Sequence, residues 1–168
     1  MTQPFSGITP PDLGESPLMT VWPTIGANAP GRFVGVLCGN RIGFGFFTLG
    51  KLLALAAIPL SLCVYAWQLM PFVCRRYTIT NRRVVIRKGL GAVEGRWISL
   101  DEFDNIQVST LSGQAWLHCG DLILRHGETE LLRLAGVPRP EQIRHVCLKA
   151  RLALTSVREV LQREAAMG

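Results

Sequence analysis

Few side chains in this sequence are of the kinds that perform catalysis. His118 and Cys119 could pair a thiol with its base, but adjacent residues of a strand point to opposite faces and cannot meet easily. The sequence has no phosphate-binding loop that ends in Gly-Lys-Ser or Gly-Lys-Thr, no dinucleotide-binding glycine fingerprint and no His-Glu-x-x-His motif. The sequence therefore predicts a protein that is not an enzyme.

The other residues that could bind a metal or transfer a proton are isolated from one another. Asp101, Glu102 and Asp104 form an acidic cluster, but no histidine lies near it, so a solvated loop is expected. His126 and His145 stand alone in the sequence and are interpreted as ordinary surface or core residues. We expect no metal and no cofactor.

Basic side chains are the strongest candidates for binding. The net charge of +6 comes from residues 75–96, which hold seven basic residues against Glu94, a difference of six. Near a membrane, each Lys or Arg adds on the order of 1 kcal/mol of attraction to anionic headgroups. The same charges would also keep this part of the chain in the cytoplasm by the positive-inside rule, and the two roles are compatible. The candidate lipid- or partner-facing residues are Arg75, Arg76, Arg82, Arg83, Arg87 and Lys88.

An apolar segment directly precedes the basic residues. Residues 52–73 contain no charge, and a helix of 22 residues spans roughly 33 Å, enough for a hydrocarbon core of about 30 Å. The sequence predicts a transmembrane helix over residues 52–74, in the inner membrane, with everything from Arg75 onward in the cytoplasm.

Two further segments come before this predicted helix. Residues 1–31 are rich in Pro and Gly, which predicts a flexible or extended lead-in that buries little surface. Residues 32–51 are apolar and glycine-rich but contain Arg41 and Lys51, which are costly in hydrocarbon. An interfacial or membrane-lining segment is favoured there, although an extension of the helix or a short hairpin also fits.

The remaining residues, 75–165, have the pattern of one small domain. Residues 77–86 alternate apolar and polar side chains around a turn at Asn81, which predicts a hairpin, and four more short strands follow up to residue 134. Pro138 to Glu141 begin a helix with an apolar stripe to about Ala165. Five scattered cysteines indicate no disulfide framework and a reducing compartment. The fold class is α+β, a small antiparallel barrel or sandwich capped by a C-terminal amphipathic helix.

The segment from Arg76 to Ile86, Arg-Tyr-Thr-Ile-Thr-Asn-Arg-Arg-Val-Val-Ile, resembles the opening hairpin of membrane-attached bacterial pleckstrin-homology (PH-like) domains. Residues 98–108 and the stretch from Gly136 to Glu141 are similar to later parts of the same family, so the resemblance covers about residues 75–152. Many members have two spanning helices before the domain, whereas only one uncharged run of that length is present here. The resemblance implies a PH-like fold and a binding or assembly module without catalytic activity.

Three functions fit these observations. The first is a membrane-anchored scaffold at the cytoplasmic face that recruits a protein partner or forms a homo-oligomer, with the basic C-terminal helix as one plausible contact. The second is direct recognition of anionic phospholipid headgroups by the basic hairpin. Nucleic-acid binding fits the pI of about 9.5 but is less favoured, because membrane topology already explains the basic residues.

Overall fold

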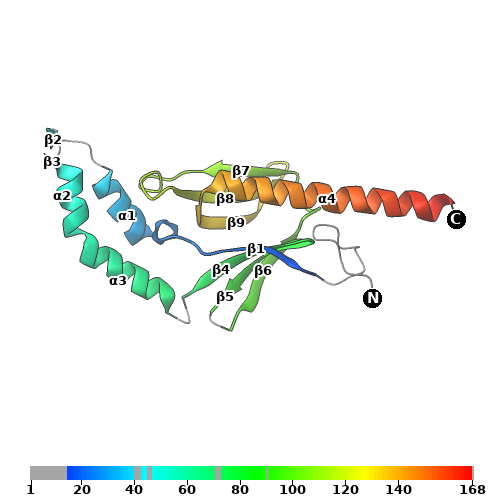
Figure 1. The fold of residues 1–168 in the computed structure, drawn as a ribbon, viewed down its shortest axis with the longest axis horizontal. Coiled ribbons are helices and arrows are strands. Elements are labelled where there is room, and N and C mark those ends of the chain that lie inside the picture. Colours follow the sequence, from blue (N-terminus) through cyan, green and yellow to red (C-terminus); the bar gives the residue numbers. More distant parts are fainter. Residues whose placement is uncertain (1–14, 40–42, 45–46, 71–72, 90, 168) are drawn as a thin grey trace.

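A computed structural model describes residues 15–39, 43–44, 47–70, 73–89 and 91–167, and the fold is given for these residues (Figure 1). Two antiparallel sheets and a long terminal helix form the main body, and a group of apolar helices projects from one end of it. The first sheet has the order β1-β4-β5-β6 and the second the order β7-β8-β9. The α+β sandwich expected from the strand patterns is confirmed.

The first sheet contains the predicted hairpin. β4 (Arg75–Thr80) pairs with β5 (Arg83–Lys88), and β5 pairs with β6 (Val93–Ser99). The hydroxyl of Thr80 accepts hydrogen bonds from the backbone N–H groups of Arg82 and Arg83 at 3.2 and 2.9 Å, and so closes the turn. The local sequence therefore contains both the strands and the turn that joins them.

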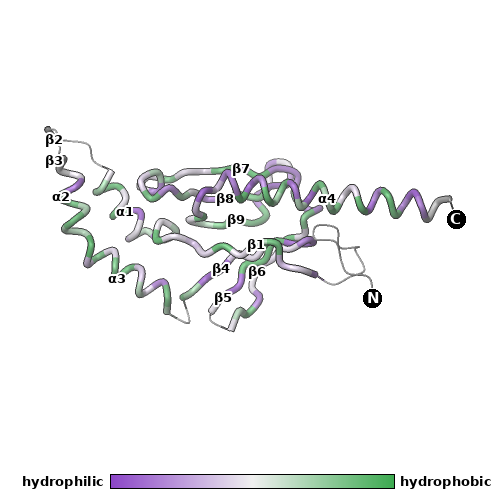
Figure 2. The backbone as a smooth tube through the Cα atoms, in the orientation of Figure 1, coloured by the Kyte–Doolittle hydropathy of each residue, from purple (hydrophilic) through white to green (hydrophobic). Residues whose placement is uncertain are grey.

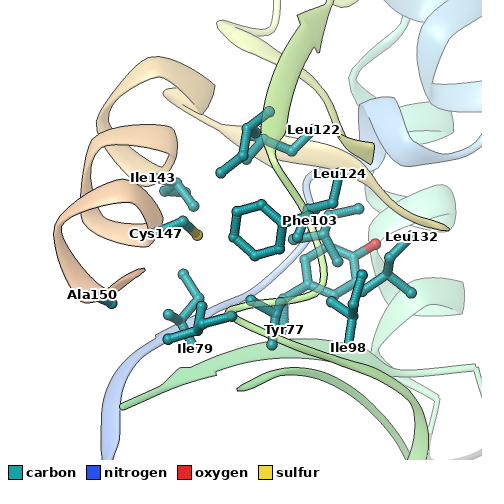
Figure 3. Packing of buried hydrophobic residues seen from close by; sticks show 14 of the residues in the cluster. Tyr77, Ile79, Ile98, Phe103, Leu122, Leu124, Leu132, Ile143, Cys147 and Ala150 are labelled. Atoms are coloured by element: carbon teal, nitrogen blue, oxygen red, sulfur yellow. The ribbon is translucent and has the colours of Figure 1, made fainter. Parts of the chain in front are cut away.

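The second sheet and the last helix follow in the predicted order. β7 (Asn105–Ser109), β8 (Cys119–His126) and β9 (Thr129–Pro138) form a meander, and α4 (Pro140–Met167) lies against β7 and β8. Phe103 fills the centre of the core, between α4 on one side and both sheets on the other (Figure 3). The apolar stripe of α4 is buried only as far as Leu154, and the helix continues beyond the sheets.

The predicted lead-in differs from the structure. Residues 1–14 lie outside the described part of the chain, but β1 (Pro17–Val21) pairs with β4 as the edge strand of the first sheet. Proline prevents long helices, yet an edge strand tolerates it, and Pro17 is the first residue of β1. A short 3-10 helix, η1 (Ile25–Ala27), and α1 (Ala29–Cys38) follow. Residues 15–38 are thus part of the folded body rather than a flexible tail.

The predicted interfacial segment, residues 32–51, is divided among several elements. Most of α1 lies within it, followed by the short strands β2 (Gly43–Phe44) and β3 (Phe47–Thr48) and the start of α2 (Leu49–Ala56). Arg41 lies outside the described residues. Among the described residues, the structure therefore places a helix, two short paired strands and the start of a second helix where one interfacial segment was favoured.

The prediction of one continuous transmembrane helix over residues 52–74 is wrong. The segment is divided between α2 and α3 (Ile58–Leu69), whose axes meet at 55°. Pro59 is in the first turn of α3; it has no N–H to donate to the carbonyl of Leu55, and its ring would clash with that carbonyl if α2 continued unbroken. Within the described residues no single helix has the length and hydropathy to cross a bilayer, and only this bent pair reaches them together.

Candidate functional site

Four of the six candidate basic residues meet at one end of the first sheet. The antiparallel register places Arg75 opposite Lys88 and Arg76 opposite Arg87, at the end of the hairpin that follows α3. Arg82 and Arg83 lie at the other end, beside the turn. Along the strand Arg82 and Lys88 are roughly 20 Å apart, but the side chains of Arg83 and Arg87 both reach Glu94. The six residues therefore form two groups, which Glu94 connects through Arg83 and Arg87.

Strand alternation divides the four residues at the α3 end again. Arg75 shares a face of β4 with Tyr77 and Ile79, which point into the core, and Lys88 is its partner on β5. Arg76 and Arg87 lie on the outer face of the sheet. The basic charge near α3 thus borders the sheet on both faces.

Carboxylates neutralise part of the outer face. Arg83 donates to Glu15 at 2.7 Å, and this hydrogen bond lowers the pKa of Glu15 and raises that of Arg83. Glu94 lies 3.4 Å from both Arg83 and Arg87. The positive charges of Arg83 and Arg87 are therefore partly compensated by the protein itself.

Tryptophan rings accompany the same basic side chains. The guanidinium of Arg76 lies 6.0 Å from the ring centroid of Trp22, and that of Arg83 lies 5.5 Å from the ring of Trp97. Both rings are exposed. Each pair is a cation–π contact, of about 0.5–1 kcal/mol at an exposed site.

A pocket of about 310 Å³ lies at the junction between the apolar helices and the first sheet. Gln68 of α3 donates through Nε2 to the carbonyls of Pro23 and Thr24, each at 3.1 Å, and its Oε1 is buried without a partner among the described residues. Apolar walls with one guanidinium at the edge could hold a hydrocarbon chain next to an anionic group. The lining residues are Trp22, Pro23, Tyr65, Gln68, Leu69, Cys74 and Arg75.

A second, larger space of about 540 Å³ lies between the start of α1 and α3. Its walls are mostly apolar and include Leu60, Val64 and Trp67 of α3, with Ala29 and Pro30 of α1 opposite them. The two spaces together make the side of α3 that faces the rest of the molecule accessible to an apolar ligand.

The residues considered for catalysis or metal binding are buried or engaged in contacts within the protein. Cys119 is buried, which raises the pKa of its thiol and disfavours the reactive thiolate, while His118 is exposed in the preceding turn. Asp101 accepts a hydrogen bond from Ser99 and pairs with Arg158, and these contacts lower its pKa to about 2. Among the described residues, no three His, Cys, Asp or Glu side chains are grouped to hold a metal.

A buried polar cluster was missed by the sequence analysis. Gln114 donates through Nε2 to Asp121 Oδ1 at 2.7 Å and to the carbonyl of Gly26 at 3.2 Å. Asp121 Oδ1 also accepts the backbone N–H of Gly136 at 3.0 Å. This cluster joins the N-terminal segment to the second sheet. The available signal was an aspartate within the otherwise apolar strand 119–124.

Comparison with protein families agrees with this architecture. A model described as Bacterial PH domain matches residues 43–151, which is more than half of the chain. The chain belongs to the bacterial PH domain family. The match begins at β2 and ends within α4, so it leaves β1, η1 and α1 of this bacterial PH domain protein outside it. No curated protein matches the chain significantly.

Proposed function

We propose that this bacterial PH domain protein is a membrane-attached, non-catalytic binding module. The observation that carries the proposal is the surface of α2 and α3, which are apolar along most of their length (Figure 2). None of the residues of α3 is buried, and Leu55, Leu62 and Trp67 are 66%, 62% and 59% exposed. Soluble monomers rarely expose so much contiguous apolar surface, so a bilayer is the natural surrounding.

The basic residues support an orientation for this module. Arg75, Arg76, Arg87 and Lys88 lie at the end of the sheet next to α3. Lys and Arg beside a membrane segment favour the cytoplasmic side. We infer that the sandwich faces the cytoplasm at the inner membrane.

The free end of α4 supports a role in protein binding. Beyond Leu154 the helix leaves the sheets, and Val160 and Leu161 are exposed, while Val157 is only half-buried (Figure 1). Residues 157 and 161 are neighbours on one helical face, as in an apolar seam that another helix could cover. The proposed occupant is a protein partner or a second copy of the chain.

Two measurements test this proposal on the full-length protein. We expect the protein to sediment with membranes after cell lysis and to stay there until detergent is added. Cross-linking in intact membranes should capture a dimer or a defined partner. A V160E/L161E variant should lose most of this cross-linked species. Q162E, on the same free end of α4, is the control and should retain it. Sedimentation without any captured neighbour would contradict the binding role.

Recognition of anionic lipid is the second candidate function. The observation that favours it is the pocket at the junction of α3 and β4, where Arg75 borders apolar walls. We expect phosphatidylglycerol, added to the detergent-solubilised protein, to raise its melting temperature more than phosphatidylcholine does. The difference should shrink in an R75Q/K88Q variant and persist in R82Q, since Arg82 lies at the far turn. Equal shifts by the two lipids would rule out this role. Nucleic-acid binding stays a minor expectation, which filter binding at physiological salt would test.

A further inference from the structure

The two ends of the apolar helical segment are joined by a sheet. β1 ends eight residues before α1 begins, and β4 begins six residues after α3 ends. The two strands are antiparallel neighbours, with Val21 opposite Tyr77 and Pro17 opposite Thr80. Neighbouring strands lie about 4.8 Å apart. The chain therefore leaves the sheet for the apolar segment and returns to it at nearly the same place.

Core packing makes this pairing part of the fold rather than a surface contact. Val21 is buried in the main core together with Tyr77, and Met19 packs against it. At the other end of β1, the N–H of Ser16 donates to the side chain of Asn81 at 3.1 Å, and the N–H of Asn81 donates to the carbonyl of Ser16 at 3.2 Å. A topology with β1 and β4 on opposite sides of a membrane would break all of these contacts.

The start of the apolar segment is also held against the second sheet. The N–H of Thr24 donates to the carbonyl of Gly136 at 2.8 Å. Within α1, a Cβ at Gly35 would lie 2.1 Å from the carbonyl oxygen of Gly113, so the helix and the loop after β7 touch backbone to backbone. α1 is therefore held against the domain between Arg32 and Val36 and cannot move far from it there.

A hairpin that crossed the bilayer would need two limbs of bilayer length, and its first limb, α1, is too short. At 1.5 Å per residue, the ten residues of α1 span about 15 Å, half of the roughly 30 Å hydrocarbon core. α2 and α3 span about 12 and 18 Å, and the 55° bend leaves about 27 Å between their far ends, so only this second limb approaches the bilayer thickness.

We propose that residues 29–69 form a re-entrant hairpin that enters and leaves the near leaflet on the side of the PH domain, without reaching the other face. The inference rests on the proposed membrane attachment. The apolar side chains of the hairpin would contact the acyl chains of that leaflet. The headgroups above them would meet the basic residues Arg75, Arg76, Arg87 and Lys88. Residues before and after the hairpin then share one side of the membrane.

Labelling of single thiols in sealed vesicles tests this arrangement. In the described structure Cys63 is the exposed cysteine and the other four are buried, so C63S of the full-length chain is the parent and its own labelling is the background. L18C reports on β1, E128C on the β8–β9 turn and T48C on the segment between α1 and α2. A membrane-impermeant maleimide is added to right-side-out and to inside-out vesicles, and detergent afterwards verifies that each thiol can react.

We expect L18C and E128C to react in the same vesicle orientation, several-fold above the parent, and T48C not to react in the other orientation. Reaction of L18C and E128C in opposite orientations would show a single span and overturn the hairpin. Reaction of T48C from the face opposite E128C would show a crossing hairpin and overturn it as well. A protein found in the supernatant before labelling would instead refute membrane attachment itself, which separates the two failures.

Discussion

The sandwich core and the segment of α1 to α3 are both rich in apolar residues, but these residues are buried in the first and mostly exposed in the second. In the sandwich, side chains such as Phe103, Leu122 and Leu134 are fully buried between the sheets and α4. In the helices, the buried apolar cluster consists of Val34, Cys38 and Ala57, and most other large apolar side chains remain exposed. Both regions are thus rich in apolar residues, but the sandwich buries them within the protein and the helices leave them exposed.

The pattern of residues accounts for this difference. Strands that alternate apolar and polar residues can bury one face inside the protein and leave the other to water. The helices 49–69 carry apolar residues on all sides, so no single packing partner within the chain can cover them. The sandwich buries its apolar side chains inside the protein. The helices leave theirs exposed, so they need an apolar surrounding such as a bilayer.

The largest expected effect comes from emptying the sandwich core. F103A should lower the free energy of unfolding by about 3–5 kcal/mol, because the ring is fully buried and its cavity cannot collapse fully. L62A, on exposed α3, should leave that free energy within about 0.5 kcal/mol of wild type. Urea unfolding of the detergent-solubilised protein measures both. Equal losses would mean that α3 is packed like the core.

The next effect concerns the buried polar cluster that joins the two regions. D121A leaves the Gln114 amide and the Gly136 N–H without their acceptor, and each buried unsatisfied group costs about 1–3 kcal/mol. D121N keeps one carbonyl oxygen and should cost less. Melting temperature checks the order of the variants. If D121A is as stable as D121N, the cluster does not hold the N-terminal segment in place.

A smaller loss is expected at the contact between α1 and the loop after β7. Gly113 has a φ of +85°, and an added Cβ would lie 2.0 Å from the carbonyl oxygen of Arg32, so G113A should cost about 2 kcal/mol and loosen α1. Gly127 has a φ of +55° with no atom within 4 Å of such a Cβ. G127A is therefore the control for backbone strain alone, at about 1 kcal/mol. Hydrogen exchange of the α1 amides should separate the two variants.

The smallest effect is the pH dependence of the α4 contact. The pKa of Asp101 is lowered from 3.8 to about 2 by the Ser99 hydrogen bond and by Arg158. A lowered pKa stabilises the folded state above the unfolded value, and this stabilisation is lost as the pH falls from about 4 through 2. Because Asp101 and Arg158 are partly exposed, we expect less than about 1 kcal/mol. Amide exchange around Arg158 should accelerate in that range, and D101N should abolish the dependence.

Local patterns were sufficient for much of the domain. The hairpin of β4 and β5 was predictable because alternation and the Thr-Asn-Arg turn lie within a dozen residues of each other. The same holds for α4, which begins at Pro140 and has a helical apolar stripe. The basic residues were found as a set, but their division between two ends of a hairpin and two faces of a sheet needed the strand register.

By itself, the sequence determined the strands between residues 77 and 134, the terminal helix and the uncharged character of residues 52–73, because these properties depend on neighbours along the chain. Only the tertiary structure decided that β1 completes the first sheet, since its partner β4 is more than fifty residues away. It also showed Gln114, Asp121 and Gly136 in contact. Long-range pairing is selected by the packing of the whole core, and that packing returns the apolar segment to the sheet from which it starts.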